Sequence, residues 1–154
     1  MEELWLNKRY LSYTTTILFI FLLMAPGIAA ADICIDGYHN VSVCKAANMI
    51  EKDNVFILDV RTPTEFYAGH IEGATLVPVK ERINGILVPV PEEIFLEEVG
   101  TNNIDKCEKI LVYCKSGGRS SLACSILVDA GYKKVYNMEG GIDAWIAQGY
   151  PVVC

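Results

Sequence analysis

Four short apolar runs follow residue 50, and each has the length of a β-strand that is buried on both faces of a sheet. They are Val55–Leu58, Thr75–Val79, Lys109–Tyr113 and Lys134–Met138. The second run contains Pro78, which cannot donate a ladder hydrogen bond, so this strand is predicted at a sheet edge.

Segments with helical patterning alternate with these strands. Ser42 can cap a helix that ends near residue 52, and the capping-box sequence Thr62–Glu65 starts another. Further helices are expected over residues 92–99, 120–130 and 142–148. The rest of 80–108 shows no clear pattern, because Gly, Pro and Asn interrupt it. The alternation predicts an α/β fold: a mainly parallel sheet with helices on both faces.

The N-terminal segment has the order of parts found in a secretory signal. Two basic residues precede an uncharged, strongly apolar stretch over 10–31, which closes with the small residues Ala29–Ala31. We therefore interpret 1–31 as a cleaved signal peptide and 32–154 as the single mature domain. The alternative is an uncleaved membrane anchor over 10–31, because this stretch is just long enough to span a bilayer. Both interpretations place the domain outside the cytoplasm.

The charge balance excludes some classes of partner. The net charge is −6, and the predicted mature chain carries the same value, because residues 1–31 hold two acidic and two basic residues. No basic run exists in the remainder, which argues against nucleic-acid binding. An anionic substrate would have to be captured by local positive charge.

One loop between the clearest strand and a helix carries the candidate chemistry. It is Cys114-Lys115-Ser116-Gly117-Gly118-Arg119. Backbone N–H groups of a Gly-rich loop, a helix N-terminus and two basic side chains would each favour thiolate over thiol, and the thiolate is the nucleophile. The same loop could bind an oxyanion. On these features alone, a buried structural cysteine is an equally good interpretation.

Four motifs in register extend beyond this loop. The segments that resemble the rhodanese family in order and spacing are Val55–Arg61 with Glu65, Gly69-His70-Ile71-x-Gly73-Ala74, Cys114–Arg119 and Glu139-Gly140-Gly141-x-x-x-Trp145. The resemblance covers roughly residues 41–152. It implies a rhodanese-like α/β domain with a five-stranded, mainly parallel sheet, and it implies no metal and no organic cofactor.

The resemblance also implies a reaction. Cys114 would take a sulfane sulfur from a small anionic donor such as thiosulfate, hold it as a persulfide, and pass it to a thiol or a protein acceptor. Cysteine phosphatases of similar fold have five residues between Cys and Arg, whereas four separate Cys114 from Arg119 here. The loop length therefore favours sulfur transfer. A partner-dependent sulfur carrier and a non-catalytic redox-sensing domain are the alternative functions.

Charged residues near the strand ends are candidates for supporting roles. Asp59 and Arg61 end the strand that precedes the first capping box, and we expect them to form a structural ion pair facing the same crevice as Cys114. Glu65 is expected to complete the capping box and nothing more. Glu139 is a candidate partner for Arg119; in that case Arg119 would shape the loop instead of binding the substrate.

Six cysteines lie after the predicted cleavage point. Cys114 must stay free to react, and Cys124 lies on an apolar helix, as expected for a buried thiol. Outside the cytoplasm the other four allow three disulfide pairings. They are Cys34, Cys44, Cys107 and Cys154. We favour Cys34–Cys154, because the rhodanese-like fold would bring the two chain ends to the same side of the domain.

The cleavage hypothesis predicts the mature N-terminus. Protein recovered from its native host should begin at Asp32, because the small residues before it suit a signal peptidase. N-terminal sequencing measures this directly. Recovery of the chain from Met1 in the membrane fraction would instead support the anchor.

Overall fold

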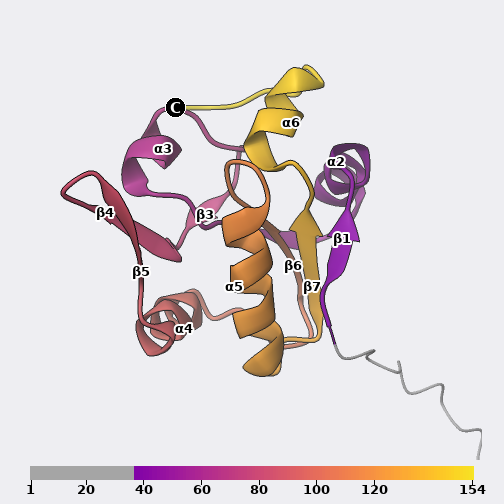
Figure 1. Ribbon diagram of the computed structural model, residues 1–154. Coiled ribbons are helices and arrows are strands. Elements are labelled where there is room, and N and C mark those ends of the chain that lie inside the picture. Colours follow the sequence, from indigo (N-terminus) through magenta and orange to yellow (C-terminus); the bar gives the residue numbers. More distant parts are fainter. Residues whose placement is uncertain (1–36) are drawn as a thin grey trace, which may run out of the picture. The chain divides into compact units, whose positions relative to one another are not determined.

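The computed structural model describes residues 37–154, so the predicted segment 1–31 and Cys34 lie outside the described part. Five strands form one parallel sheet in the order β1-β7-β6-β2-β3 (Figure 1). They are β1 (His39–Val41), β2 (Val55–Asp59), β3 (Thr75–Leu76), β6 (Lys109–Tyr113) and β7 (Lys134–Met138). The prediction of a parallel α/β sheet is confirmed, and β6 occupies its centre.

Helices cover both faces of this sheet. On one face lie α4 (Glu92–Thr101) and α5 (Gly118–Asp129), and on the other lie α2 (Val43–Lys52) and α6 (Gly141–Ala147) (Figure 1). The short α3 (Pro63–Tyr67) has no buried residue. No helix within residues 37–154 is long and apolar enough to cross a membrane.

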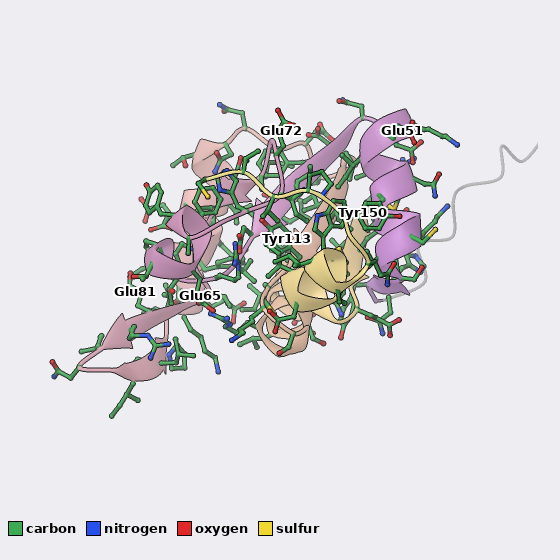
Figure 2. The ribbon with its side chains drawn as sticks, turned by 90° about the horizontal axis from the view of Figure 1, so that it is seen from above. Glu51, Glu65, Glu72, Glu81, Tyr113 and Tyr150 are labelled. Atoms are coloured by element: carbon green, nitrogen blue, oxygen red, sulfur yellow. The ribbon has the colours of Figure 1, made fainter. Side chains whose placement is uncertain are left out.

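The side chains of β6 show why the strand sequence is continuously apolar. Successive side chains point to opposite faces. Ile110 and Val112 pack in the cluster under α4 and α5, whereas Leu111 and Tyr113 pack in the cluster under α2 and α6. All four are 0% exposed. In Figure 2, Tyr113 lies centrally within the domain, while Glu51 and Glu72 lie at its periphery.

Both predicted helix caps are confirmed. The Lys45 N–H donates to Ser42 Oγ at the start of α2. At the start of α3, Thr62 Oγ1 accepts from the Glu65 N–H, and the Glu65 carboxylate accepts from the Thr62 N–H at 3.1 Å. The chain therefore turns sharply into α3 directly after β2, which brings α3 to the carboxyl edge of the sheet.

The structure differs from the sequence expectations between residues 75 and 90. The predicted strand over 75–79 is at the edge, as expected, but only Thr75–Leu76 pair with β2. A hairpin that the pattern did not predict follows: β4 (Lys80–Ile83) and β5 (Ile86–Pro89). Its turn, Asn84-Gly85, has positive φ at both residues, the two-residue turn that suits a hairpin. The three-residue strand β1 was also not predicted.

Candidate active site

Cys114 follows the central strand β6, whose neighbours are β2 and β7. In a parallel sheet the carboxyl ends of the strands form the edge at which ligands bind. The residue is buried, with 1% of its surface exposed. A reactive group at this position is shielded from bulk water and must be reached through the loop that follows it.

Helix α6 fixes the backbone of that loop. The N–H of Ile142 donates to the Cys114 carbonyl at 2.9 Å, and the N–H of Asp143 donates to the Lys115 carbonyl at 3.1 Å. In a trans peptide the following N–H points opposite to the carbonyl. The N–H groups after these two carbonyls therefore point away from α6.

Gly141 allows this contact because it has no side chain. A Cβ at this position would lie 2.5 Å from the Lys115 carbonyl oxygen and would also collide with the Cys114 carbonyl oxygen. Its φ of +57° also disfavours other residues. Gly141 is thus required by the close approach of α6 to the loop.

The sulfur of Cys114 accepts hydrogen bonds from its own loop. The Gly117 N–H donates to Sγ at 3.1 Å, and the Ser120 hydroxyl lies 3.5 Å from Sγ and 3.0 Å from the Gly117 carbonyl. A hydroxyl has one proton, so it donates to one of these acceptors at a time. Ionisation of the sulfur favours donation to Sγ.

These hydrogen bonds decide the acidity of the thiol. Burial favours the neutral form, yet the pKa of Cys114 is lowered, because the Ser120 hydroxyl and nearby backbone N–H groups stabilise the thiolate. The backbone donors belong to Ser120, Gly117 and Ser116. Cys124, also buried as predicted, has no such donors, and burial raises its pKa. The two buried thiols therefore differ in reactivity.

The predicted loop residues fall into different environments. Lys115, Ser116 and Gly118 are exposed, whereas Gly117 is half-buried. Gly117 has φ +106° and precedes the first residue of α5, where its N–H faces the sulfur. The loop thus directs the Gly117 N–H toward the Cys114 sulfur, whereas Lys115 is exposed to solvent.

Arg119 pairs with Glu65 and not with its candidate partner Glu139. Its two terminal nitrogens donate to the two carboxylate oxygens of Glu65 at 2.6 and 2.7 Å. The expectation that Glu65 only completes a capping box is wrong. The hydrogen bond from Arg119 is the largest cause that lowers the pKa of Glu65 to about 2, and the hydrogen bonds within the cap add to it. Glu65 balances much of the charge that Arg119 was expected to offer the thiolate.

Asp59 and Arg61 form the expected structural ion pair. Arg61 Nη2 donates to Asp59 Oδ2 at 2.6 Å, and both side chains are buried. The same nitrogen donates to the Gly69 carbonyl at 2.8 Å, which ties the loop after β2 to the turn after α3. With its donors directed at these partners, Arg61 maintains the shape of the site.

A pocket of about 220 Å³ adjoins the loop at Lys115. Its walls come from the α3 region, from α6 and from the C-terminal segment. They are Arg61, Glu65, Ala68, Gly69, Lys115, Ile142, Asp143, Ile146 and Val152. A larger pocket of about 570 Å³ lies between Tyr38 and the end of α5, and its lining within residues 37–154 includes no thiol and no basic side chain. The smaller pocket thus adjoins the loop at Lys115, the residue that follows Cys114.

The C-terminal segment is held against this pocket. Val153 and His70 exchange two backbone hydrogen bonds, of 2.8 and 2.9 Å, and Trp145 Nε1 donates to the Pro151 carbonyl. Val152 is thereby kept in the pocket wall. The Cys34–Cys154 disulfide stays a prediction, because Cys34 lies outside the described residues.

The fold thus places a buried thiol of lowered pKa in a Gly-rich loop between the central parallel strand and a helix. The model of the family described as rhodanese-like domain matches residues 37–148. The chain belongs to this family.

Curated relatives and a solved structure agree with the family. The chain is 39% identical to Thiosulfate sulfurtransferase 18 of Arabidopsis thaliana, over 73% of this chain and 82% of that protein. It is 33% identical to a Sulfurtransferase of Allochromatium vinosum, over 68% and 84%. A rhodanese-related protein from Thermoplasma volcanium has a similar structure, with a TM-score of 0.58 and 28% identity, covering 75% of this chain and 98% of that one.

The contact between α6 and the loop generates a prediction about Gly141. Gly141→Ala should lower the free energy of unfolding by more than the ~1–2 kcal/mol of an unfavourable φ, because the Cβ also displaces two backbone carbonyls. It should also raise the Cys114 pKa as the loop N–H groups shift. Denaturant unfolding and thiolate absorbance titration measure the two effects.

Gly118→Ala is the matched control for this prediction. A Cβ at Gly118 meets nothing within 4 Å, and the residue has no positive φ. This variant should keep both stability and thiol acidity. Equal behaviour of the two variants would contradict the proposed dependence on α6.

The low pKa of Glu65 generates a pH prediction. A carboxyl whose folded pKa lies near 2, below the ordinary 4.5, stabilises the fold above pH 4.5 and loses that contribution as the pH falls toward 2. Glu65→Gln should therefore be less stable than the wild type near pH 6, by on the order of 1 kcal/mol after solvent screening. The difference should shrink toward pH 2. Urea unfolding across this range tests it, and a difference independent of pH would refute it.

Proposed function

We propose that this protein is a sulfurtransferase that carries sulfane sulfur on Cys114. The observation that carries the proposal is the position of the sulfur: it is buried, yet its pKa is lowered because it accepts hydrogen bonds from the Ser120 hydroxyl and from loop N–H groups. Such a thiolate can attack an electrophilic sulfur without a separate general base. The relatives named as sulfurtransferases support the same activity.

The donor that fits this site is a small anionic sulfur compound, such as thiosulfate. Backbone N–H groups that stabilise a thiolate also stabilise the negative charge on a persulfide or a bound oxyanion. Lys115 adds an exposed positive charge at the loop, and no ion pair occupies it among residues 37–154. Because Cys114 is buried, only slender donors and acceptors can reach its sulfur.

We infer that the domain works outside the cytoplasm. Several curated relatives, 33–40% identical, are named as chloroplastic or mitochondrial, which raises an organellar transit peptide as the alternative. Transit peptides are rich in Arg and Ser and poor in acidic residues. Residues 1–31 contain one Arg, one Ser and two Glu, which supports the secretory interpretation.

The test of the activity is Cys114→Ser. A serine hydroxyl is similar in size but far less acidic, so sulfur transfer from thiosulfate to cyanide should be abolished while the fold is kept. Mass spectrometry of the wild type after incubation with thiosulfate should show one added sulfur atom on Cys114.

Cys107→Ser is the control, because Cys107 is exposed and lies before β6, at the opposite end of that strand from the loop. It should keep full activity. Persulfide formation on Cys114 without turnover of cyanide would identify a partner-dependent carrier instead. Full transfer activity in Cys114→Ser would exclude Cys114 as the carrier of the sulfur.

A further inference from the structure

The turn of the β4–β5 hairpin exposes two large apolar side chains to solvent. Ile83 and Ile86 are paired across the Asn84-Gly85 turn, and they are 52% and 69% exposed. The hairpin projects from the rest of the domain, and its own chain leaves both side chains uncovered (Figure 1, Figure 2). Apolar side chains that cluster on the surface are typical of a site where another molecule binds.

A positive charge is held beside these two side chains. Arg82 Nη1 donates to the Gly85 carbonyl at 2.9 Å, which places the guanidinium at the turn. Arg82 is exposed, and it takes part in no ion pair among residues 37–154. We refer to Arg82, Ile83 and Ile86 as the hairpin tip. Because the tip is apolar with a cation at its border, it fits a surface that is apolar with acidic residues at its border.

Helix α4 carries a surface of this kind. Its inner side holds Phe95 and Val99, both 0% exposed, whereas Ile94 is 47% exposed. Glu97 and Glu98 follow Ile94 by three and four residues, so they lie next to it on the outer side of the helix, and both are exposed. Neither forms an ion pair within the described part of the chain. We refer to Ile94, Glu97 and Glu98 as the acidic side of α4.

We propose that the hairpin tip of one copy docks on the acidic side of α4 of a second copy, and that the protein forms a symmetric dimer in this way. Ile83 and Ile86 contact the partner's Ile94, and Arg82 binds the carboxylates that border it. Each copy contributes both surfaces, so a two-fold axis generates the contact twice. The inference goes beyond the proposed function and does not depend on it.

A second copy suits the hairpin tip better than a lipid surface does. Docking on an anionic membrane needs several cations around the apolar side chains, whereas β4 holds two basic residues and one acidic residue. The chain as a whole carries a net charge of −6. An anionic surface would also repel the exposed glutamates of α4, which begins three residues after β5. In a second copy the same glutamates attract Arg82 instead.

The first test is sedimentation velocity of the protein, in the form in which its host processes it, over a range of concentrations. The wild type should form a dimer. Ile86→Asp should raise the dissociation constant by about a hundredfold, because a loss of about tenfold for one buried apolar contact occurs twice in a symmetric dimer. Ile146→Asp is the matched control: Ile146 is 52% exposed and lies on α6, which covers the other face of the sheet. A wild type that is monomeric at every concentration would overturn the inference.

Charge reversal tests which surfaces meet. Arg82→Glu should prevent self-association, and so should a variant that combines Glu97→Lys with Glu98→Lys, because like charges then face each other. A mixture of these two proteins should form a dimer. In the mixture the acidic tip of the first protein meets the basic helix of the second, and the unchanged tip of the second meets the unchanged helix of the first. Tips that pack only against each other predict no recovery in the mixture, and that result would overturn the proposed contact.

A peptide inserted between Asn84 and Gly85 tests the contact without replacing any side chain. Both residues are exposed, so the domain should keep its urea unfolding midpoint while the dimer is lost. A dimer that persists with the insertion would overturn the inference.

Cosedimentation with vesicles of phosphatidylcholine and phosphatidylglycerol tests the lipid alternative. The wild type should stay in solution. Binding to these vesicles that Ile86→Asp abolishes, in a protein that does not self-associate, would assign the hairpin tip to a lipid surface and overturn the inference. Because self-association is measured without any sulfur donor, its outcome is separate from that of the sulfur-transfer assay.

Discussion

The site depends on two hydrogen bonds between the start of α6 and the loop after β6. Ile142 and Asp143 bind the carbonyl oxygens of Cys114 and Lys115, and this orientation leaves the following N–H groups for the other side of the loop. One of these, the N–H of Ser116, is among the backbone groups that lower the pKa of Cys114, together with the N–H groups of Gly117 and Ser120. A segment that begins more than twenty residues later in the chain thus contributes to the acidity of the Cys114 thiol.

The positive charge near the sulfur is smaller than the loop sequence alone indicates. Arg119 lies in the loop but is bound to Glu65, so much of its charge is balanced within the protein. Asp59 does the same for Arg61. Lys115 remains as the exposed cation of the pocket. The site therefore activates its thiol mainly with dipoles, and these act at short range and are less sensitive to salt than full charges at the surface.

Local patterns predicted much of the fold. The apolar run of β6 identified the central strand, because only a strand covered on both faces needs apolar residues at every position. Ser42 and Thr62 marked helix starts correctly, since capping is decided within a few residues. The hairpin over 80–89 was missed although Asn84-Gly85 is a hairpin signal, because β4 is mostly charged and β5 is apolar throughout, so neither strand shows clean alternation. Partners distant in sequence were harder: Glu65 was assigned only its local role, and nothing near Arg119 in the chain identifies its true partner.

The course of the last five residues has a practical meaning for anyone who produces this protein. Val153 forms hydrogen bonds with His70 through both its N–H and its carbonyl, and Val152 forms part of the pocket wall. A purification tag fused after Cys154 would extend from the domain beside the pocket, where it would compete with small molecules for entry to the pocket. Insertions in the exposed turn at Asn84-Gly85 avoid this difficulty, because the two residues contribute nothing to the core and the turn lies away from the C-terminal segment (Figure 1).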